Sequence, residues 1–297
     1  MIIIDYIQDK LYHNYQLWNI FARHLSIMNT YNIIDQMGLP VDLPTKPKRI
    51  ISLVPSQTEL LFDIGLDKTI VGITRFCNHP IHIVNSKVKI GGTKNFNIEV
   101  IKALAPDLII GNKEENYEAG ILELKKHYHV WMSDITTIDD AYTMMDAIGT
   151  ITNKSSEVEG LIKSIKDSFS ELPIVHFPLS IPTVAYFIWR KPYMVAASGT
   201  FIDSMLNVLG VVNAFAGLSR YPELSTEHIA ACKADYIFLS SEPYSFSEMH
   251  FEEFQDLCPT AKIIVVDGEL FSWYGSRLKH SADYFVRLRT QMIDSLY

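Results

Sequence analysis

The sequence predicts an α/β fold with two Rossmann-like lobes, and two observations lead to this class. Apolar runs typical of buried parallel strands alternate with helical stretches, first over residues 50–134 and again after residue 180. A helix-to-strand segment also occurs twice, as NIEVIKALAPDLII (97–110) and STEHIAACKADYIF (225–238). Glu99 and Glu227 hold matching positions in these copies, which lie about one domain length apart. We therefore expect one copy in each lobe.

Four strands are expected in the first lobe, with helices between them. They are RIISLVP (49–55), TIVGIT (69–74), DLIIG (107–111) and HVWMSD (129–134). In the helix that follows the first strand, Ser56 and Glu59 have capping-box spacing and Gly65 is the expected C-terminal stop.

The same order of elements restarts in the second lobe. Its strands are predicted at PTVAYFIW (182–189), ADYIFLS (234–240) and AKIIVVD (261–267), and its last helix at RLKHSADYFVRLRTQMIDSL (277–296). A further helix, GTFIDSMLNVLG (199–210), repeats the capping-box spacing with Thr200 and Asp203 and ends at Gly210. The repetition predicts two similar lobes.

One amphipathic helix is predicted to join the lobes. SSEVEGLIKSIKDSFSELP (155–173) places its apolar residues on one helical stripe and ends at Pro173. A single helix is a stiff connector, so the ligand cleft is expected between lobes that rock only modestly. The expected division is an N-terminal extension (1–34), an N-terminal lobe (35–153), the linking helix (154–173) and a C-terminal lobe (174–297).

Composition and charge exclude several classes of protein. The 297 residues carry a net charge of −8, which argues against a sequence-independent nucleic-acid binder. The three cysteines include no CxxC pair, so the sequence predicts neither a disulfide framework nor a structural zinc site. A single disulfide remains an alternative. No apolar run reaches the length of about 18 residues that a membrane span needs, and the N-terminal segment has no recognisable secretory leader.

The ligand site is expected in loops at the carboxyl ends of the strands, because open α/β sheets present their ligands there. Aromatic rings in these loops, Tyr274 among them, suit a large flat or greasy ligand, and nearby cations supply charge. The ligand-binding candidates are Pro55, Ser56, Arg75, Phe76, Lys94, Asn95, Phe96, Glu114, Trp189, Arg190, Tyr193, Tyr221, Phe271 and Trp273.

A metal site and an enzyme centre have weaker sequence support. Cys77, His79 and His82 have the ligand types that zinc or iron prefers, but no second close cluster completes a four-ligand set. No GxGxxG follows a strand, and neither GxxxxGK[ST] nor GxSxG occurs. The adjacent acids Glu114 and Glu115 are a base or a metal ligand in one reading and solvated loop charges in the other. We expect no enzyme and no required cofactor.

Taken in order, five segments resemble the helical-backbone receptors of ABC importers, which are periplasmic-binding-protein-like and bind vitamin B12, haem or iron siderophores. The B12-binding branch is the most similar. The resemblance covers residues 35–290, and its carriers are DQMGLPVDLPTKPKRIISLVPSQTELLFDIGL, VGITRFCNHP, IGGTKNFNIEVIKALAPDLII, SGTFIDSMLNVLGVVNAF and VVDGELFSWYGSRL.

The resemblance implies a ligand, a partner and a compartment. The ligand would be a metal chelate, namely cobalamin or another corrinoid, haem or a ferric siderophore. Aromatic cleft positions of the family are kept at Phe76 and Tyr221, and one that falls on Thr93 or Lys94 is lost. The partner would be a permease whose arginines dock on one surface glutamate of each lobe, here Glu99 and Glu227. A monomer in the periplasm or cell envelope is implied, whereas the unrecognised leader leaves the cytoplasm open.

Three other functions stay open at the level of sequence. The same fold would serve a cytoplasmic corrinoid or metal sensor or chaperone. A free metal-ion receptor would use Cys77, His79 and His82. A doubly wound metal-cluster or nucleotide enzyme is the outside alternative, because fold does not fix function.

Overall fold

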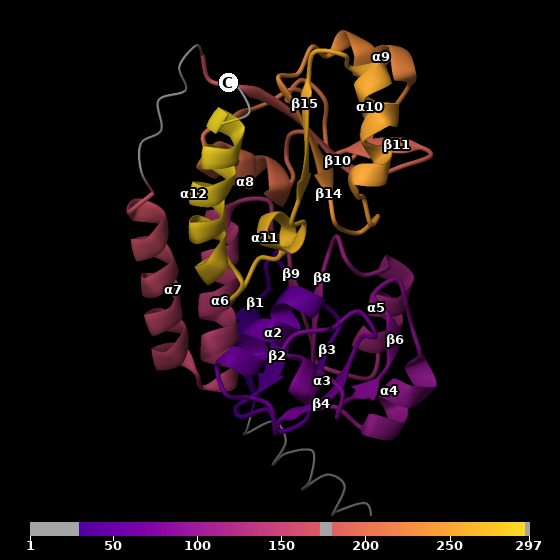
Figure 1. Ribbon diagram of the computed structural model, residues 1–297. Coiled ribbons are helices and arrows are strands. Elements are labelled where there is room, and N and C mark those ends of the chain that lie inside the picture. The colour runs from indigo at the N-terminus through magenta and orange to yellow at the C-terminus, as the bar shows by residue number, and fades with distance from the viewer. Residues whose placement is uncertain (1–29, 173–179, 295–297) are drawn as a thin grey trace, which may run out of the picture.

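Two α/β lobes face each other in the computed structural model, which describes residues 30–172 and 180–294 (Figure 1). The predicted fold class is confirmed. Residues 1–29, most of the predicted extension, lie outside the described ranges. Within the described ranges, no helix has the length and apolar character to cross a bilayer.

The first lobe is built on a fully parallel sheet. The strand order is β5-β4-β3-β8-β9, formed by Val88–Lys89, Ile70–Ile73, Ile50–Ser52, Leu108–Asn112 and Val130–Ser133. All residues of β3, β8 and β9 are buried, as expected for parallel strands covered on both faces. Helices α2 (Pro55–Asp63), α3 (Ile81–Val84), α4 (Ile98–Leu104), α5 (Glu118–Lys125) and α6 (Ile138–Thr152) belong to this lobe, with a short β6 (Gly91–Gly92) and β7 (Asn95–Phe96) pair.

The second lobe has a mixed sheet. The order is β13-β11-β10-β14-β15, formed by Glu223–Leu224, Tyr193–Val195, Thr183–Trp189, Tyr236–Ser240 and Lys262–Val266, and β12 (Val212–Asn213) also pairs with β10. The pairs of β10 with β14 and of β14 with β15 are parallel, whereas β11 is antiparallel to β10 and to β13. The helical elements are α8 (Phe201–Leu209), α9 (Thr226–Ala231), η1 (Glu248–His250), α10 (Phe251–Leu257), α11 (Glu269–Ser272) and α12 (Leu278–Asp294).

Helix α7 (Ser155–Ser170) occupies the predicted linking segment and lies along one side of the molecule (Figure 1). It packs against α6 of the first lobe and α12 of the second. Val158, Ile162 and Ile165 bury the predicted apolar stripe. Residues 173–179, through which α7 reaches β10, lie outside the described ranges, so the connection itself stays a prediction.

Helix caps test the predicted boundaries. The Thr200 hydroxyl accepts a hydrogen bond from the Asp203 N–H at 3.1 Å, and Gly210 adopts φ 83° at the C-cap, so the start and end of α8 are confirmed. The predicted capping box of α2 is wrong. Pro55 takes the first helical turn after an extended Val54, and no side chain caps the helix. The side chain of Glu59 is therefore free for another partner.

A short hairpin crosses the predicted start of the first lobe. Residues 30–34, which the sequence places in the extension, form β1 (Thr30–Ile34), which pairs antiparallel with β2 (Pro40–Pro44). The Asp35 carboxylate closes the turn between them, because it accepts the N–H groups of Met37 and Leu39, each at 2.9 Å.

Candidate functional site

A cavity of about 760 Å³ lies between the two lobes. Its walls include loops after β3, β4 and β8 of the first sheet and the segments after β14 and β15 of the second, which are the carboxyl ends expected to hold ligands. The lining residues are Val54, Pro55, Ser56, Phe76, Asn78, Thr93, Lys94, Glu114, Glu115, Ile188, Met194, Phe201, Ile202, Tyr221, Glu242, Pro243, Ser272, Trp273 and Tyr274. The volume falls within the range of sites that take small molecules.

Seven of the sequence-predicted ligand residues line this cavity: Pro55, Ser56, Phe76, Lys94, Glu114, Tyr221 and Trp273. The other seven lie elsewhere. Phe96 and Phe271 are in the core, where Phe96 packs 4.7 Å from Tyr117 and Phe271 packs 4.9 Å from Phe285 (ring centroids). An aromatic residue near a strand end can face the core as readily as the cleft. Residue type alone therefore does not distinguish a core residue from a cleft residue.

The remaining five are not part of the cavity lining. Arg190 and Tyr193 both bind the carboxylate of Glu253, with the Arg190 Nη2 atom 2.7 Å from Oε2. Trp189 packs edge-on against Tyr244, with ring centroids 5.7 Å apart.

The other two belong to the first lobe. Arg75 is exposed, with its guanidinium carbon 5.0 Å from the ring centroid of Phe76. Asn95 lies in β7, opposite Gly92.

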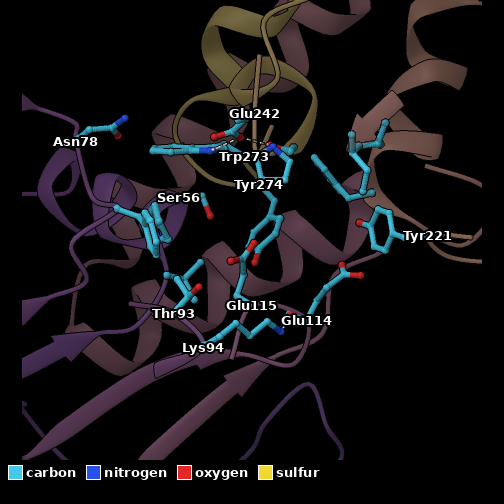
Figure 2. Close-up of a pocket in the computed structure, with 18 of the residues that line it drawn as sticks. Ser56, Asn78, Thr93, Lys94, Glu114, Glu115, Tyr221, Glu242, Trp273 and Tyr274 are labelled. Atoms are coloured by element: carbon cyan, nitrogen blue, oxygen red, sulfur yellow. Dashed lines mark hydrogen bonds between the residues drawn. The ribbon is translucent and has the colours of Figure 1, made fainter. Parts of the chain in front are cut away.

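Three carboxyl groups and one ammonium group give the cavity wall an acidic balance. Glu114 and Glu115 follow β8, Glu242 follows β14, and Lys94 comes from the β6–β7 turn (Figure 2). Burial, and then the neighbouring Glu242, raises the pKa of Glu115 to about 7. The pKa of Glu242 is also raised by burial, although hydrogen bonds from Ser272 (2.7 Å) and Trp273 (2.9 Å) oppose the shift.

Trp273 is an aromatic side chain of the wall that its neighbours hold on several sides. Its indole N–H donates to Glu242, the His79 ring packs edge-on against it at 5.5 Å, and the Arg277 guanidinium carbon lies 5.0 Å from its ring centroid. A ring fixed on several sides loses little conformational freedom when a ligand packs on it. Trp273 is therefore a prepared contact surface.

Sequence reasoning missed several of the lining residues, above all Glu115 and Glu242. In the sequence, Glu115 is one of two adjacent loop acids, and Glu242 stands in SSEPYSF (240–246), a loop whose only signal is its position at the end of a strand. Gly268 makes room for Glu242, because a Cβ there would meet its Cγ at 2.6 Å.

Ion pairs between the lobes lie on two sides of the cavity. On one side Arg277 of the second lobe binds Glu59 of the first through two hydrogen bonds, at 2.6 and 2.8 Å. Arg277 also contacts Glu269 at 2.9 Å, and Glu269 in turn contacts His79 of the first lobe at 2.9 Å. Lys279 and Asp63 add an exposed pair at 2.9 Å. We call this group the Arg277 network.

On the other side, Arg220 of the second lobe binds Glu114 of the first. Figure 2 shows Glu114 and Tyr221 together on this side, opposite Asn78. Burial raises the pKa of Glu114, and Arg220 and Tyr221 oppose that shift.

The metal candidates do not form a cluster. Within the described ranges, no group of three or more His, Cys, Asp and Glu side chains is arranged to hold a metal ion. Cys77 is buried with its sulfur 3.2 Å from the Thr58 hydroxyl, and burial raises the pKa of its thiol. His79 is committed to Glu269.

The paired glutamates of the repeated segment lie at the exposed starts of α4 and α9. Asn97 caps α4 by accepting the N–H groups of Glu99 and Val100 at 3.0 and 3.2 Å, and Ser225 caps α9. The Glu99 side chain is 80% exposed, with Lys102 2.9 Å away. Hydrogen bonding to Ser225 lowers the pKa of Glu227. In Figure 1, α4 and α9 lie on the side away from α7.

Comparison with known proteins identifies the family to which this chain belongs. The sequence profile of a family described as periplasmic binding protein matches residues 50–256, well over half of the chain. The chain belongs to this family. A Bacillus subtilis relative of this binding protein, called an uncharacterized ABC transporter substrate-binding lipoprotein YvrC, is 27% identical over 214 residues, 69% of this chain and 67% of the relative. A vitamin B12-binding protein of Vibrio cholerae is 26% identical over 211 residues, 69% and 75% of the two chains.

Solved structures share the fold of this binding protein. A possible iron-binding periplasmic solute-binding protein of Staphylococcus epidermidis is 25% identical, with a TM-score of 0.67 over 85% of this chain and 99% of that chain. The periplasmic heme-binding protein RhuT of Roseiflexus sp. RS-1 is 19% identical, with a TM-score of 0.73 over 84% and 99%.

Proposed function

We propose that this binding protein captures a metal chelate, a cobalamin-type corrinoid foremost, between its lobes and delivers it to the permease of an ABC importer. The observation that carries the proposal is the cavity between the lobes, which both lobes line with aromatic rings: Phe76 from the first, and Tyr221, Trp273 and Tyr274 from the second. A flat macrocycle or a compact chelate packs well on such rings.

The charge of the cavity favours one class of chelate over the others. Glu114, Glu115 and Glu242 outnumber the single ammonium of Lys94 in the lining, and with Glu114 paired to Arg220 two acidic groups still face this one cation. Haem carries propionates and catecholate siderophores are strongly anionic, so burying either beside these carboxyl groups costs electrostatic free energy. The rim of a corrinoid carries primary amides instead, which donate hydrogen bonds to carboxylates. A chelate without net negative charge is therefore the expected ligand.

The names of the relatives point in the same direction. The Bacillus subtilis relative supports a role in ABC transport, and the Vibrio cholerae relative supports a corrinoid ligand. By the same argument we propose that the protein works in the cell envelope. Fractionation of cells that produce the full protein tests this, and recovery in the cytoplasm would instead favour a sensor or chaperone.

Binding is tested by calorimetric titration of the purified protein with four chelates. Cyanocobalamin is expected to bind one molecule per chain and the neutral ferric hydroxamate ferrichrome more weakly, whereas hemin and the anionic ferric enterobactin bind least. If hemin or ferric enterobactin bound more tightly than the two uncharged chelates, the charge argument would be wrong. If none of the four chelates produced heat or raised the melting temperature, the proposed binding of a metal chelate would be wrong.

Permease docking is proposed for Glu99 and Glu227, one on each lobe. A simpler explanation for these two glutamates, without docking, is that a first-turn carboxylate stabilises its own helix by roughly 0.3–1 kcal/mol. That explanation applies equally to Glu118 in the first turn of α5 and Glu252 in the first turn of α10, which are also exposed. These two residues therefore provide a matched control pair.

The double variant Glu99→Arg/Glu227→Arg is expected to retain ligand binding and to lose most uptake in cells. Glu118→Arg/Glu252→Arg is expected to change neither. Equal loss of uptake in both double variants, or loss of ligand binding in the first, would contradict a docking role.

A further inference from the structure

Two cysteines of the second lobe lie side by side at the ends of neighbouring helices. Cys232 is the C-cap of α9 and Cys258 is the C-cap of α10, and the two helices pack together. The carbonyl oxygen of Ile229 accepts both the backbone N–H of Cys232, at 3.2 Å, and the thiol of Cys258, at 3.3 Å. One oxygen atom thus brings the Cys258 sulfur next to the backbone of Cys232.

The surroundings separate the roles of the two thiols. Cys258 is buried in an apolar cluster of the second lobe, and Cys232 packs against that cluster while keeping part of its surface exposed. Burial, followed by the neighbouring Cys232 thiol, which shares a hydrogen bond with it, raises the pKa of Cys258 to about 11. Cys258 is therefore a protonated thiol near neutral pH, and Cys232 is the one that an oxidant reaches.

The third cysteine is not a neighbour of Cys232 or Cys258. Cys77 is buried in the first lobe, where its sulfur lies 3.2 Å from the Thr58 hydroxyl and 3.3 Å from the Thr74 hydroxyl. It serves as an internal reference, because it is a buried thiol of the same chain without a neighbouring cysteine.

We propose that Cys232 and Cys258 form a disulfide when the protein meets a disulfide oxidant. The Cys232 thiolate attacks one sulfur of that oxidant, which gives a mixed disulfide and releases one thiol. The Cys258 sulfur then attacks the Cys232 sulfur, loses its proton and displaces the second thiol. The two cysteines lose two protons and two electrons in total, and the oxidant is reduced to two thiols.

The bond would tie α9 to α10 across the intervening loop and β14. It would constrain the unfolded chain and hold α9, whose first turn carries Glu227, against the lobe. Such disulfides form outside the reducing cytoplasm, so the redox state of the pair would also report the compartment of the protein. This inference does not depend on the identity of the ligand.

The test uses the full-length protein, reduced and then treated with oxidised glutathione at neutral pH. The count of free thiols after denaturation is expected to fall from three to one, with an intact mass lower by two hydrogens and no bound glutathione. Peptide mapping is expected to join the peptides that contain Cys232 and Cys258. The oxidised protein is expected to melt on the order of 5 °C higher than the reduced protein.

Two variants make the test specific. Cys77→Ser is expected to form the same bond, and Cys232→Ser is expected to keep both of its remaining thiols. The proposal is overturned if three thiols persist, if glutathione stays attached to Cys232, if the bond joins two chains, or if Cys77 takes part in it. A melting temperature unchanged by oxidation would overturn the proposed constraint on the lobe.

Discussion

The two sides of the cleft are held together by unequal sets of ion pairs. In the Arg277 network, the Arg277 and Glu59 side chains are only 13% and 10% exposed, and two hydrogen bonds join them. On the other side, the Arg220 and Glu114 side chains are 43% and 28% exposed. Exposed pairs are worth little because water and salt screen them, whereas a buried charge that loses its partner is costly. The difference indicates that the lobes are fixed at the Arg277 network and part more easily at Arg220.

The largest effect is expected from breaking the Arg277 network. Arg277→Met removes the charge and leaves Glu59 and Glu269 without their shared cation. We expect the free energy of unfolding to fall by about 3 kcal/mol. Urea denaturation measures it, with Lys279→Met as the control, because the exposed Lys279–Asp63 pair should cost less than about 1 kcal/mol. Equal losses in the two variants would remove the basis for calling this side fixed.

A pH-dependent effect is expected from Glu115, which lies between the two sides (Figure 2). Its pKa is about 7 in the folded protein against a usual value of 4.5, so the folded state binds the proton more tightly than the unfolded chain. The contribution of Glu115 to stability is therefore most favourable below pH 4.5, declines as the pH rises to about 7 and is constant above.

Glu115→Gln removes this titration. The variant should gain stability relative to the wild type between pH 4.5 and 7, by up to about 3 kcal/mol. Thermal unfolding across that pH range measures the difference, and Glu118→Gln on the exposed surface of α5 is the control. A difference that does not change with pH would show that Glu115 ionises normally in the folded protein.

The smallest effect on stability is expected from Arg220. Arg220→Met should lower the free energy of unfolding by less than about 1 kcal/mol, because water reaches this pair more readily than the pair of Arg277 and Glu59. Without Arg220, the pKa of Glu114 should rise further, since Arg220 is the main influence that lowers it. The same urea series tests the first point, and a loss as large as that of Arg277→Met would overturn the comparison between the two sides.

Much of the fold could be predicted from the sequence, because buried strands and capped helices leave local patterns. The strands β3, β4, β9, β10, β14 and β15 fall within predicted runs, and β8 extends one residue beyond its predicted run. The α2 cap could not be predicted correctly, since Ser56 and Glu59 have the right spacing while Pro55 decides where the helix begins. The β1–β2 hairpin could not be predicted because its second strand, PVDLP, begins and ends with prolines, and this pattern is typical of a loop.

The site was less predictable than the fold. The loops that line the cavity follow from the strand order, but the direction of each side chain does not, so Trp273 and Phe271, two residues apart, end in the cavity wall and in the core. The pairing of Glu59 with Arg277 joins residues 218 positions apart, and no local pattern records such a contact.

The most direct test of the central claim is the affinity of cyanocobalamin for three proteins: the wild type, Trp273→Ala and Trp189→Ala. Trp273 lines the cavity and Trp189 does not. If the ligand is held between the lobes, the wild type binds one cobalamin, Trp273→Ala weakens binding by about tenfold to a hundredfold, and Trp189→Ala leaves it unchanged. Binding that is equally weakened by both substitutions, or unaffected by the loss of Trp273, would contradict capture in this cavity.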